Sequence, residues 1–433
     1  MKYEVLKGSH IKRNILIGAL VVLMLTAIIL NFTQAKYRTT QSIPLINGTI
    51  NYTPYDFKIM AMFQENGDNY IEINQMPNEN YSINEIKSYC TIDNTNKDPD
   101  IKLYTDDKGQ HVFANLKKSS KCYLYFDENT CPLGDNICNK ILQNKEIRTR
   151  TNFHRTAYKE ITTNVIFEGK ENNKKTYYFA GNPTDNWVKF AGFYWRIIRI
   201  NSDGSIRLIY QWTSANTTGT GTQIGKSVFN SNSNNNAYLG YMYSEGEVHG
   251  LSKTSTIKSI LDNWYQNNLN KYSSYIEINA GFCNDRSLTT GTGLGSDDSW
   301  YEPNNRMVNT GKPTFNCQET DDLFTVKESS IGNKSLTYPV GLITADEINF
   351  AGGAYYTENK EFYLYTGQEY WTISPRNYTS VAKPFALTIN GLNSMTNGTT
   401  STLGVRPVIN IKADTQITGS GTSTDPFKVV GAS

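Results

Sequence analysis

The feature that most constrains this 433-residue chain is an uncharged apolar run near its start. The run NILIGALVVLMLTAIILNF covers residues 14–32, which is close to the ~20 residues that span a bilayer as a helix. Basic residues before the run favour a cytoplasmic N-terminus. We therefore expect a cytoplasmic tail over residues 1–13, a transmembrane signal anchor over residues 14–35, and an extracellular bulk.

A cleaved signal peptide is the competing interpretation of the same segment. Ala35, just before Lys36, completes a weak small-residue cleavage site. The apolar run is longer than the usual core of about 7–15 residues in a signal peptide, so we favour the uncleaved anchor. The expected location is thus the cell membrane, with a single pass and the N-terminus in the cytoplasm.

The six cysteines fit an exported chain, where disulfides persist. No CxxC pair occurs and the four histidines are scattered, so the pattern favours disulfides over a structural metal site. The sequence leaves several pairings open. Nearest-neighbour pairing is the simplest, and it predicts Cys90–Cys122, Cys131–Cys138 and Cys283–Cys317.

Composition and turn residues predict an α+β chain that is rich in strands. The net charge is only +2, which gives no electrostatic case for nucleic-acid binding. Many tyrosines and phenylalanines, together with Asn, Ser, Thr and Gly, are typical of strands joined by long polar loops. We expect a small β-sandwich stalk domain over 41–127, a linker with a short helix over 128–170, and a large loop-rich domain over 171–433.

The stretch FAGFYWRIIRINSDGSIRLIYQW, residues 190–212, carries three arginines among aromatic and aliphatic residues. Arg196, Arg199 and Arg207 suit either an anion clamp or a structural role inside a β-rich core. Strand alternation explains them without a ligand, so we favour the structural role. The tetrapeptide NSDG, residues 201–204, predicts a hairpin loop with Gly204 at positive φ.

Helices are few in the large domain. Ser255 or Thr256 can begin one, because apolar residues follow at helical spacing. Thr344 and Glu347 form the pattern of a capping box at the start of a second, short helix, and Gly352 ends it.

Three motifs follow one another along the large domain: Trp195-Arg196-Ile197, Trp371-Thr-Ile-Ser374-Pro375 and Gly404-Val405-Arg406-Pro407. This order resembles the bacterial extracellular family named domain of unknown function 6273. The resemblance implies a membrane-anchored bacterial surface protein with a C-type-lectin-like or sulfatase-modifying-factor-like (formylglycine-generating-enzyme-like) fold. It also implies structural core roles for Trp195, Arg196, Trp371, Ser374, Arg406 and Pro407. Formylglycine-generating enzymes are oxidases that use a pair of cysteines late in this fold. No cysteine follows Cys317 here, so oxidase activity does not carry over.

Two candidate ligand sites stand out. Tyr238, Tyr241 and Tyr243 offer aromatic surfaces for a sugar or a protein if they cluster on the surface, whereas core packing is the plainer interpretation. Glu302 and Asn304 belong to the Glu-Pro-Asn tripeptide with which C-type lectins hold calcium and sugar hydroxyls. The companion Trp-Asn-Asp tripeptide is missing, so calcium is the one candidate cofactor and otherwise none is expected.

No nucleophile elbow and no HExxH motif occurs, so the sequence names no catalytic residue. We therefore expect a non-catalytic surface protein that adheres to an extracellular glycan or protein. The alternatives are an envelope enzyme that acts on polysaccharide and a structural envelope component. Carboxylates gathered in a deep pocket would favour the enzyme.

Overall fold

The computed structural model describes residues 57–67, 69–92, 96–106 and 108–433. Strands hold 34% of the residues and helices 15%, which confirms a β-rich α+β protein. The predicted tail, the predicted anchor and the first part of the stalk domain lie outside the described residues. Within the described ranges, no helix combines the length and apolarity that a bilayer crossing requires.

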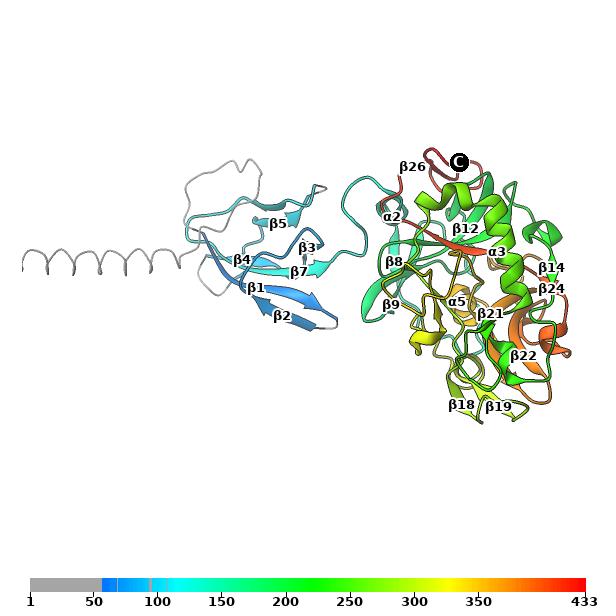
Figure 1. Cartoon of the computed structure of the whole chain (residues 1–433). Coiled ribbons are helices and arrows are strands. Elements are labelled where there is room, and N and C mark those ends of the chain that lie inside the picture. Colours follow the sequence, from blue (N-terminus) through cyan, green and yellow to red (C-terminus); the bar gives the residue numbers. More distant parts are fainter. Residues whose placement is uncertain (1–56, 68, 93–95, 107) are drawn as a thin grey trace, which may run out of the picture. The chain divides into compact units, whose positions relative to one another are not determined.

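The first domain is built on a five-stranded sheet with β7 (Lys121–Glu128) at its centre (Figure 1). The parallel strand β1 (Lys58–Asn66) lies beside β7 and carries the antiparallel β2 (Asn69–Ile73) on its other edge. The short strands β3 (Tyr81–Ile83) and β4 (Tyr89–Thr91) pair with opposite ends of β7. A separate pair, β5 (Lys102–Thr105) and β6 (His111–Ala114), shares its buried core.

The predicted disulfide Cys90–Cys122 is present and lies within one sheet. Cys90 on β4 and Cys122 on β7 are direct neighbours in one antiparallel ladder. The two sheets are instead held together by apolar packing that includes Ile83, Leu103 and Phe126.

The larger domain contains a nine-stranded sheet that includes the predicted hairpin (Figure 1). Strand β12 (Phe193–Ile200) pairs with β13 (Ile206–Trp212), and Gly204 in the loop has φ of 80°. The sheet is completed by β8 (Glu146–Arg148), β9 (Val165–Glu171), β10 (Lys174–Tyr178), β11 (Trp187–Phe190), β25 (Val408–Ile411), β26 (Ile417–Thr418) and β27 (Phe427–Val429).

The predicted linker over 128–170 is wrong, because this segment belongs to the larger domain. Its helix α2 (Ile137–Leu142) buries Ile137 and Ile141 in the main core, and β8 and β9 form one end of the nine-stranded sheet. The short helix predicted within this segment is present. The sequence suggested a linker because a long stretch of exposed and partly buried residues separates the buried residues of α2 from those of β9.

A second, seven-stranded sheet is centred on β21 (Tyr370–Tyr378). Its other members are β14 (Lys226–Ser227), β18 (Leu288–Thr290), β19 (Ser299–Tyr301), β22 (Ala382–Thr388), β23 (Gly391–Asn393) and β24 (Leu403–Gly404). Two small ladders pair β15 (Met242–Tyr243) with β16 (Lys253–Thr254) and β17 (Phe282–Cys283) with β20 (Leu323–Phe324).

The segment GVRPVINIK, residues 404–412, which we call the closing segment, contributes to two strands. Its first part, β24, belongs to the seven-stranded sheet, whereas β25 pairs antiparallel with β13 of the opening hairpin. Pro407 stands between the two strands and has no amide hydrogen to donate to a ladder. The opening and closing segments therefore meet in space, and the same closing segment links both sheets.

Helices are short and capped as the sequence predicts. Helix α3 (Thr256–Asn268) begins at Ser255, whose side chain accepts a hydrogen bond from the Lys258 amide. Helix α5 (Ala345–Ala351) has the complete Thr344–Glu347 capping box and ends at Gly352 with φ of 117°. The rest are α4 (Glu302–Asn304), the 3-10 turns η1 (Gly219–Thr222), η2 (Asn236–Leu239), η3 (Asn270–Tyr275), η5 (Thr320–Asp322) and η6 (Gly398–Thr400), and the π-helical turn η4 (Asn305–Thr310).

Candidate functional site

A polar cavity of about 140 Å³ lies beside the turn that joins β9 and β10. Its walls come from β12, β13, the loop after β12, the segments 280–285 and 314–317, and the start of α5. At ~10–15 Å³ for one water, the cavity holds roughly ten waters. That capacity suits a single sugar residue or another small polar molecule.

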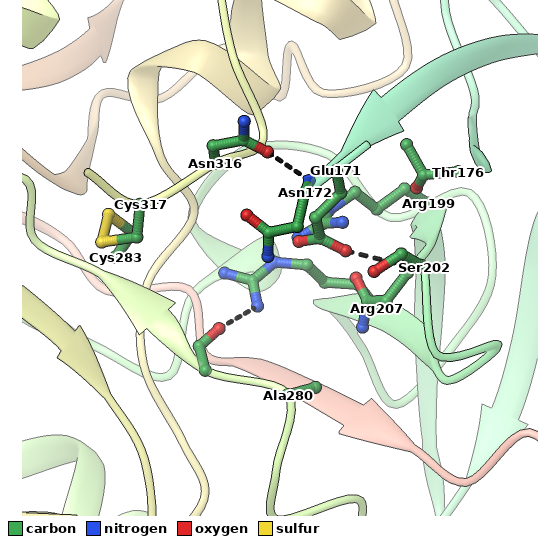
Figure 2. A network of polar contacts seen from close by, with 12 residues as sticks. Glu171, Asn172, Thr176, Arg199, Ser202, Arg207, Ala280, Cys283, Asn316 and Cys317 are labelled. Atoms are coloured by element: carbon green, nitrogen blue, oxygen red, sulfur yellow. Dashed lines mark hydrogen bonds and ion pairs between the residues drawn. A yellow bond between two sulfur atoms is a disulfide. The ribbon is translucent and has the colours of Figure 1, made fainter. Parts of the chain in front are cut away.

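Two arginines and two glutamates form a charged network along the cavity. Figure 2 shows three of them, Arg199, Arg207 and Glu171. Arg199 Nη2 lies 2.9 Å from Glu171 Oε1, and Arg199 Nε lies 3.2 Å from Glu347 Oε1. The same Glu347 oxygen lies 2.5 Å from Arg207 Nε. One carboxylate is therefore shared by two guanidinium groups, and all four side chains are largely shielded from solvent.

The pKa values of Arg199, Glu171 and Arg207 are shifted in different directions. For Arg199, burial alone would lower the pKa, but the charges of Glu171 and Glu347 outweigh it and raise the pKa. For Glu171, burial would raise the pKa, but Arg199 outweighs it and lowers the pKa. Arg207 differs, because burial lowers its pKa despite Glu347. Arg207 is thus the cation that its surroundings compensate least.

A third arginine faces the same cavity with two further carboxylates. Arg306 Nε lies 2.7 Å from Asp346 Oδ1, and Arg306 Nη1 lies 2.9 Å from Asp285 Oδ2. Asp346 Oδ1 also accepts a hydrogen bond from the Thr314 amide at 3.0 Å. These contacts fix the wall between η4 and α5, because each charged group there is held by a partner of opposite sign.

The start of α5 supplies two of the cavity acids. Glu347 completes the capping box, since its Oε2 accepts the Thr344 amide at 3.0 Å while its Oε1 faces the arginines. Asp346 precedes it in the first turn and faces Arg306. Acidic residues are favoured in the first turn of a helix by the partial positive charge of its free amides. The local helix signal therefore also orients the site.

The turn between β9 and β10 positions the opposite wall. Asn172 and Asn173 both take positive φ, 52° and 65°, as a two-residue hairpin turn requires. The Asn172 amide donates to Asn316 Oδ1 at 2.6 Å, and the Ser202 amide donates to Glu171 Oε2 at 2.9 Å (Figure 2). Three loops are joined by these contacts around the cavity.

The disulfide Cys283–Cys317 and the ring of Phe315 complete the lining. The disulfide joins β17 to the segment that carries Phe315 and Asn316, so it holds two walls in place (Figure 2). The Phe315 ring stacks on Phe350 with centroids 3.9 Å apart, and the Arg199 guanidinium carbon lies 4.8 Å from the Phe315 centroid. All three predicted disulfides are present, and no described cysteine is free.

The structure does not bring the predicted tyrosine surface to solvent. Tyr238 and Tyr241 are buried, with 8% and 0% exposure, and the Tyr241 hydroxyl donates to the Val340 carbonyl oxygen. Tyr243 is half-buried and packs edge-on against Tyr238 at a centroid distance of 5.4 Å. The condition for a ligand surface is therefore not met, and core packing is the interpretation that fits these rings.

Glu302 and Asn304 of the lectin-like tripeptide lie in α4 and are already engaged by neighbouring side chains. Glu302 accepts from Thr289 Oγ1 and Asn305 Nδ2, and the buried Asn304 accepts from Arg376 Nε at 3.4 Å. Neither residue lines the cavity. Across the described ranges, no group of three or more His, Cys, Asp or Glu residues is arranged to hold a metal ion.

The residues that the motifs assign to the core are buried as predicted: Trp195, Arg196, Trp371, Ser374, Arg406 and Pro407. The Trp195 indole donates to the Phe190 carbonyl oxygen and the Trp371 indole to the Ser227 carbonyl oxygen. The structural interpretation of the arginines thus fits Arg196 and Arg406. It is incomplete for Arg199 and Arg207, which also face the cavity.

Sequence reasoning missed the acidic half of the cavity. Glu171 stands at the end of a strand, Asp285 lies in a loop, and Glu347 was noted only as a helix cap. Glu347 is 148 residues from Arg199 and 140 from Arg207 along the sequence, so no local pattern links them. A charged residue inside an otherwise apolar strand was the one available signal, and it marks both arginines.

Comparison with known proteins identified no match to a protein-family model, to a curated protein or to a solved structure.

Proposed function

We propose that this protein is a non-catalytic binding protein that recognises a sugar residue of an extracellular glycan in the cavity around Arg199 and Arg207. The observation that carries the proposal is the cavity itself. It is small, lined mainly by charged and amide side chains, and bordered by the Phe315 ring. Sugars are bound by such sets of polar groups, while aromatic rings pack on their apolar faces.

The state of the cavity acids favours binding over catalysis. Glu171, Asp285, Asp346 and Glu347 each lie within ion-pair distance of an arginine. General acid–base hydrolysis of a glycoside needs one carboxyl group that donates a proton and a second that activates water or attacks. Glu171 is poorly suited to donate that proton because Arg199 lowers its pKa, whereas burial raises the pKa of Asp285 despite its pairing with Arg306.

A glycan array probed with the purified full chain, with and without calcium, tests the proposal. We expect binding to a restricted set of glycans, abolished by Glu171→Gln, because this change removes the acid that holds Arg199 and the loop at Ser202. Tyr243→Phe is the matched control, since Tyr243 does not line the cavity. An array without binding in both conditions, or equal binding by the Glu171→Gln variant, would overturn the proposal.

A polysaccharide-acting enzyme is the second candidate, favoured by the five carboxylates that line this cavity. Asp203, exposed at the cavity, is the one among the five without an arginine within ion-pair distance in the described residues. Release of reducing ends from bacterial envelope polysaccharide by the wild-type chain, lost in Asp203→Asn, would favour this candidate. Absence of release, together with binding on the array, would exclude it for those substrates.

We further propose that the chain is a membrane-anchored bacterial surface protein of the kind that carries domain of unknown function 6273. The support is the apolar run at 14–32 and the three ordered motifs at Trp195, Trp371 and Gly404. Membrane fractionation tests the anchor, because a shortened soluble chain that begins at Lys36 would show that the segment is cleaved.

A further inference from the structure

Arg207 is held more rigidly than a surface cation would be. Its Nε lies 2.5 Å from Glu347 Oε1, and its Nη1 donates to the Gly281 carbonyl oxygen at 3.1 Å. Its guanidinium carbon lies 4.9 Å from the centroid of the Phe282 ring. A group fixed in this way loses little conformational entropy when it binds a partner.

The remaining nitrogen of this guanidinium is unoccupied. Within the described residues, Arg207 Nη2 makes no hydrogen bond, and it is not among the unpartnered nitrogens sealed inside the protein. Arg207 lines the cavity, and Figure 2 shows its guanidinium extending below the side chain of Asn172. Arg207 itself is buried, so its Nη2 is an unpartnered donor on the lining of the cavity.

The cavity lining carries five carboxylates and three arginines, but Arg207 has only a share of one acid. Its carboxylate partner, Glu347, is shared with Arg199 and with the Thr344 amide. Glu171 pairs with Arg199 and with the Ser202 amide. Burial lowers the pKa of Arg207 despite the nearby Glu347. The protein alone therefore does not fully stabilise the charged form of this side chain.

Acceptors for hydroxyl groups stand elsewhere on the cavity lining. Asp203 uses Oδ1 to accept from Ser205, while its Oδ2 accepts no hydrogen bond in the part of the chain described. The exposed amides of Asn172 and Asn316 add donors and acceptors. The lining thus offers one anchored cationic fork together with several groups that match hydroxyls.

We propose that the ligand bears a carboxylate that binds Arg207 Nη2, so that the cavity selects a uronic acid of an acidic glycan over neutral sugars. This inference rests on the proposed binding function and specifies its ligand class. The carboxylate of the ligand pairs with Arg207, whose own acid is shared with Arg199, and the ring hydroxyls face Asp203, Asn172 and Asn316. A charge-assisted bond from arginine to carboxylate is about twice as strong as a neutral one.

Calorimetric titration of the full chain with three sugars tests the ligand class. Glucuronate carries the carboxylate, glucuronamide has the same shape without the charge, and glucose lacks the group. We expect glucuronate to bind roughly 10- to 100-fold more tightly than either neutral sugar. Equal affinities, or tighter binding of a neutral sugar, would overturn this inference and leave sugar binding intact. Absence of binding by all three, with an array that is also blank, would overturn both.

The variant Arg207→Met links the preference to the residue. We expect the ratio of glucuronate to glucuronamide affinity to fall to about one, whereas Tyr243→Phe keeps the wild-type ratio. Arg207→Lys restores the charge without the planar fork and should recover part of the ratio. A preference that persists in a folded Arg207→Met protein would assign the carboxylate to another group. If that variant does not fold, the three-sugar titration of the wild type decides alone.

Discussion

Two pairs of buried arginines lie in very different surroundings, although their residues come from the same two segments, 190–212 and 404–412. Arg196 and Arg406 lie in the closed core, where they donate to backbone carbonyl oxygens of Pro183, Tyr210 and Leu364. Arg199 and Arg207 lie at the cavity and pair with carboxylates. The first pair is surrounded by fixed dipoles and the second by carboxylate groups within ion-pair distance.

The difference appears in the pKa of each side chain. Burial lowers the pKa of Arg196 to about 9, since no carboxylate contacts its guanidinium. Burial likewise lowers the pKa of Arg406. Arg199, between two glutamates, has a raised pKa, and Arg207 again a lowered one. Core arginines that carbonyl oxygens satisfy hold the fold, whereas an arginine with a shared acid at a cavity keeps capacity for a ligand.

Removing a core arginine should have the largest effect. Arg406→Met removes the arginine donor from two buried acceptors, on Tyr210 and Gln211, while the Leu364 carbonyl oxygen keeps the Tyr370 hydroxyl as a donor. At about 1–3 kcal/mol for each unsatisfied acceptor, we expect a loss of about 5 kcal/mol in the free energy of unfolding. Urea denaturation measures it. A loss below that of the cavity variant Glu347→Gln would contradict the contrast between the two pairs.

Neutralising the shared acid at the cavity should have the next largest effect. Glu347→Gln leaves Arg207 without its acid and Arg199 with Glu171 alone, so we expect destabilisation by about 3–5 kcal/mol. Any protein that stays folded should also lose glycan affinity. Denaturation and titration of the same sample separate the effects, and unchanged affinity would remove Glu347 from the site.

Removing the Cys283–Cys317 disulfide should lower both the stability of the protein and its affinity for the glycan. Its cysteines are 34 residues apart, which predicts a loss of about 3–4 kcal/mol for the double change to serine. Because the disulfide lines the cavity, affinity should fall as well. The control is Cys131→Ser with Cys138→Ser, a disulfide outside the cavity lining, which should leave the affinity of the folded protein unchanged.

The smallest effect concerns His249, which pairs with the buried acid Asp322. Asp322 accepts from Arg286 and lies 3.0 Å from His249 Nδ1. The hydrogen bond to Asp322 raises the pKa of His249 in the folded protein, and burial opposes it. Stability from this contact is therefore complete below about pH 6.5 and is lost as the pH rises through the folded-state pKa.

The expected size of this pH effect is below about 1 kcal/mol, because His249 is partly exposed. Denaturation of the wild type at about pH 6 and about pH 8 measures it, with His249→Gln as the variant that should lack it. An identical pH dependence in the two proteins would show that His249 contributes nothing.

Local signals in the sequence determined much of the fold. The NSDG loop and its alternating strands predicted the β12–β13 hairpin, and Ser255, Thr344 and Gly352 predicted helix ends that the structure contains. Nearest-neighbour pairing gave all three disulfides. Each of these features depends on residues close together in the chain, where spacing and backbone preference decide the outcome.

Tertiary structure alone decided which polar residues share a cavity and which tyrosines are buried. Arg196 and Arg199 stand three positions apart on one strand, yet one contacts backbone oxygens and the other contacts Glu347, 148 residues away. Strand alternation assigns a side chain to a face but does not say what covers that face. The partner of a buried charge is set by how distant segments pack, because only that packing brings the compensating acid within reach.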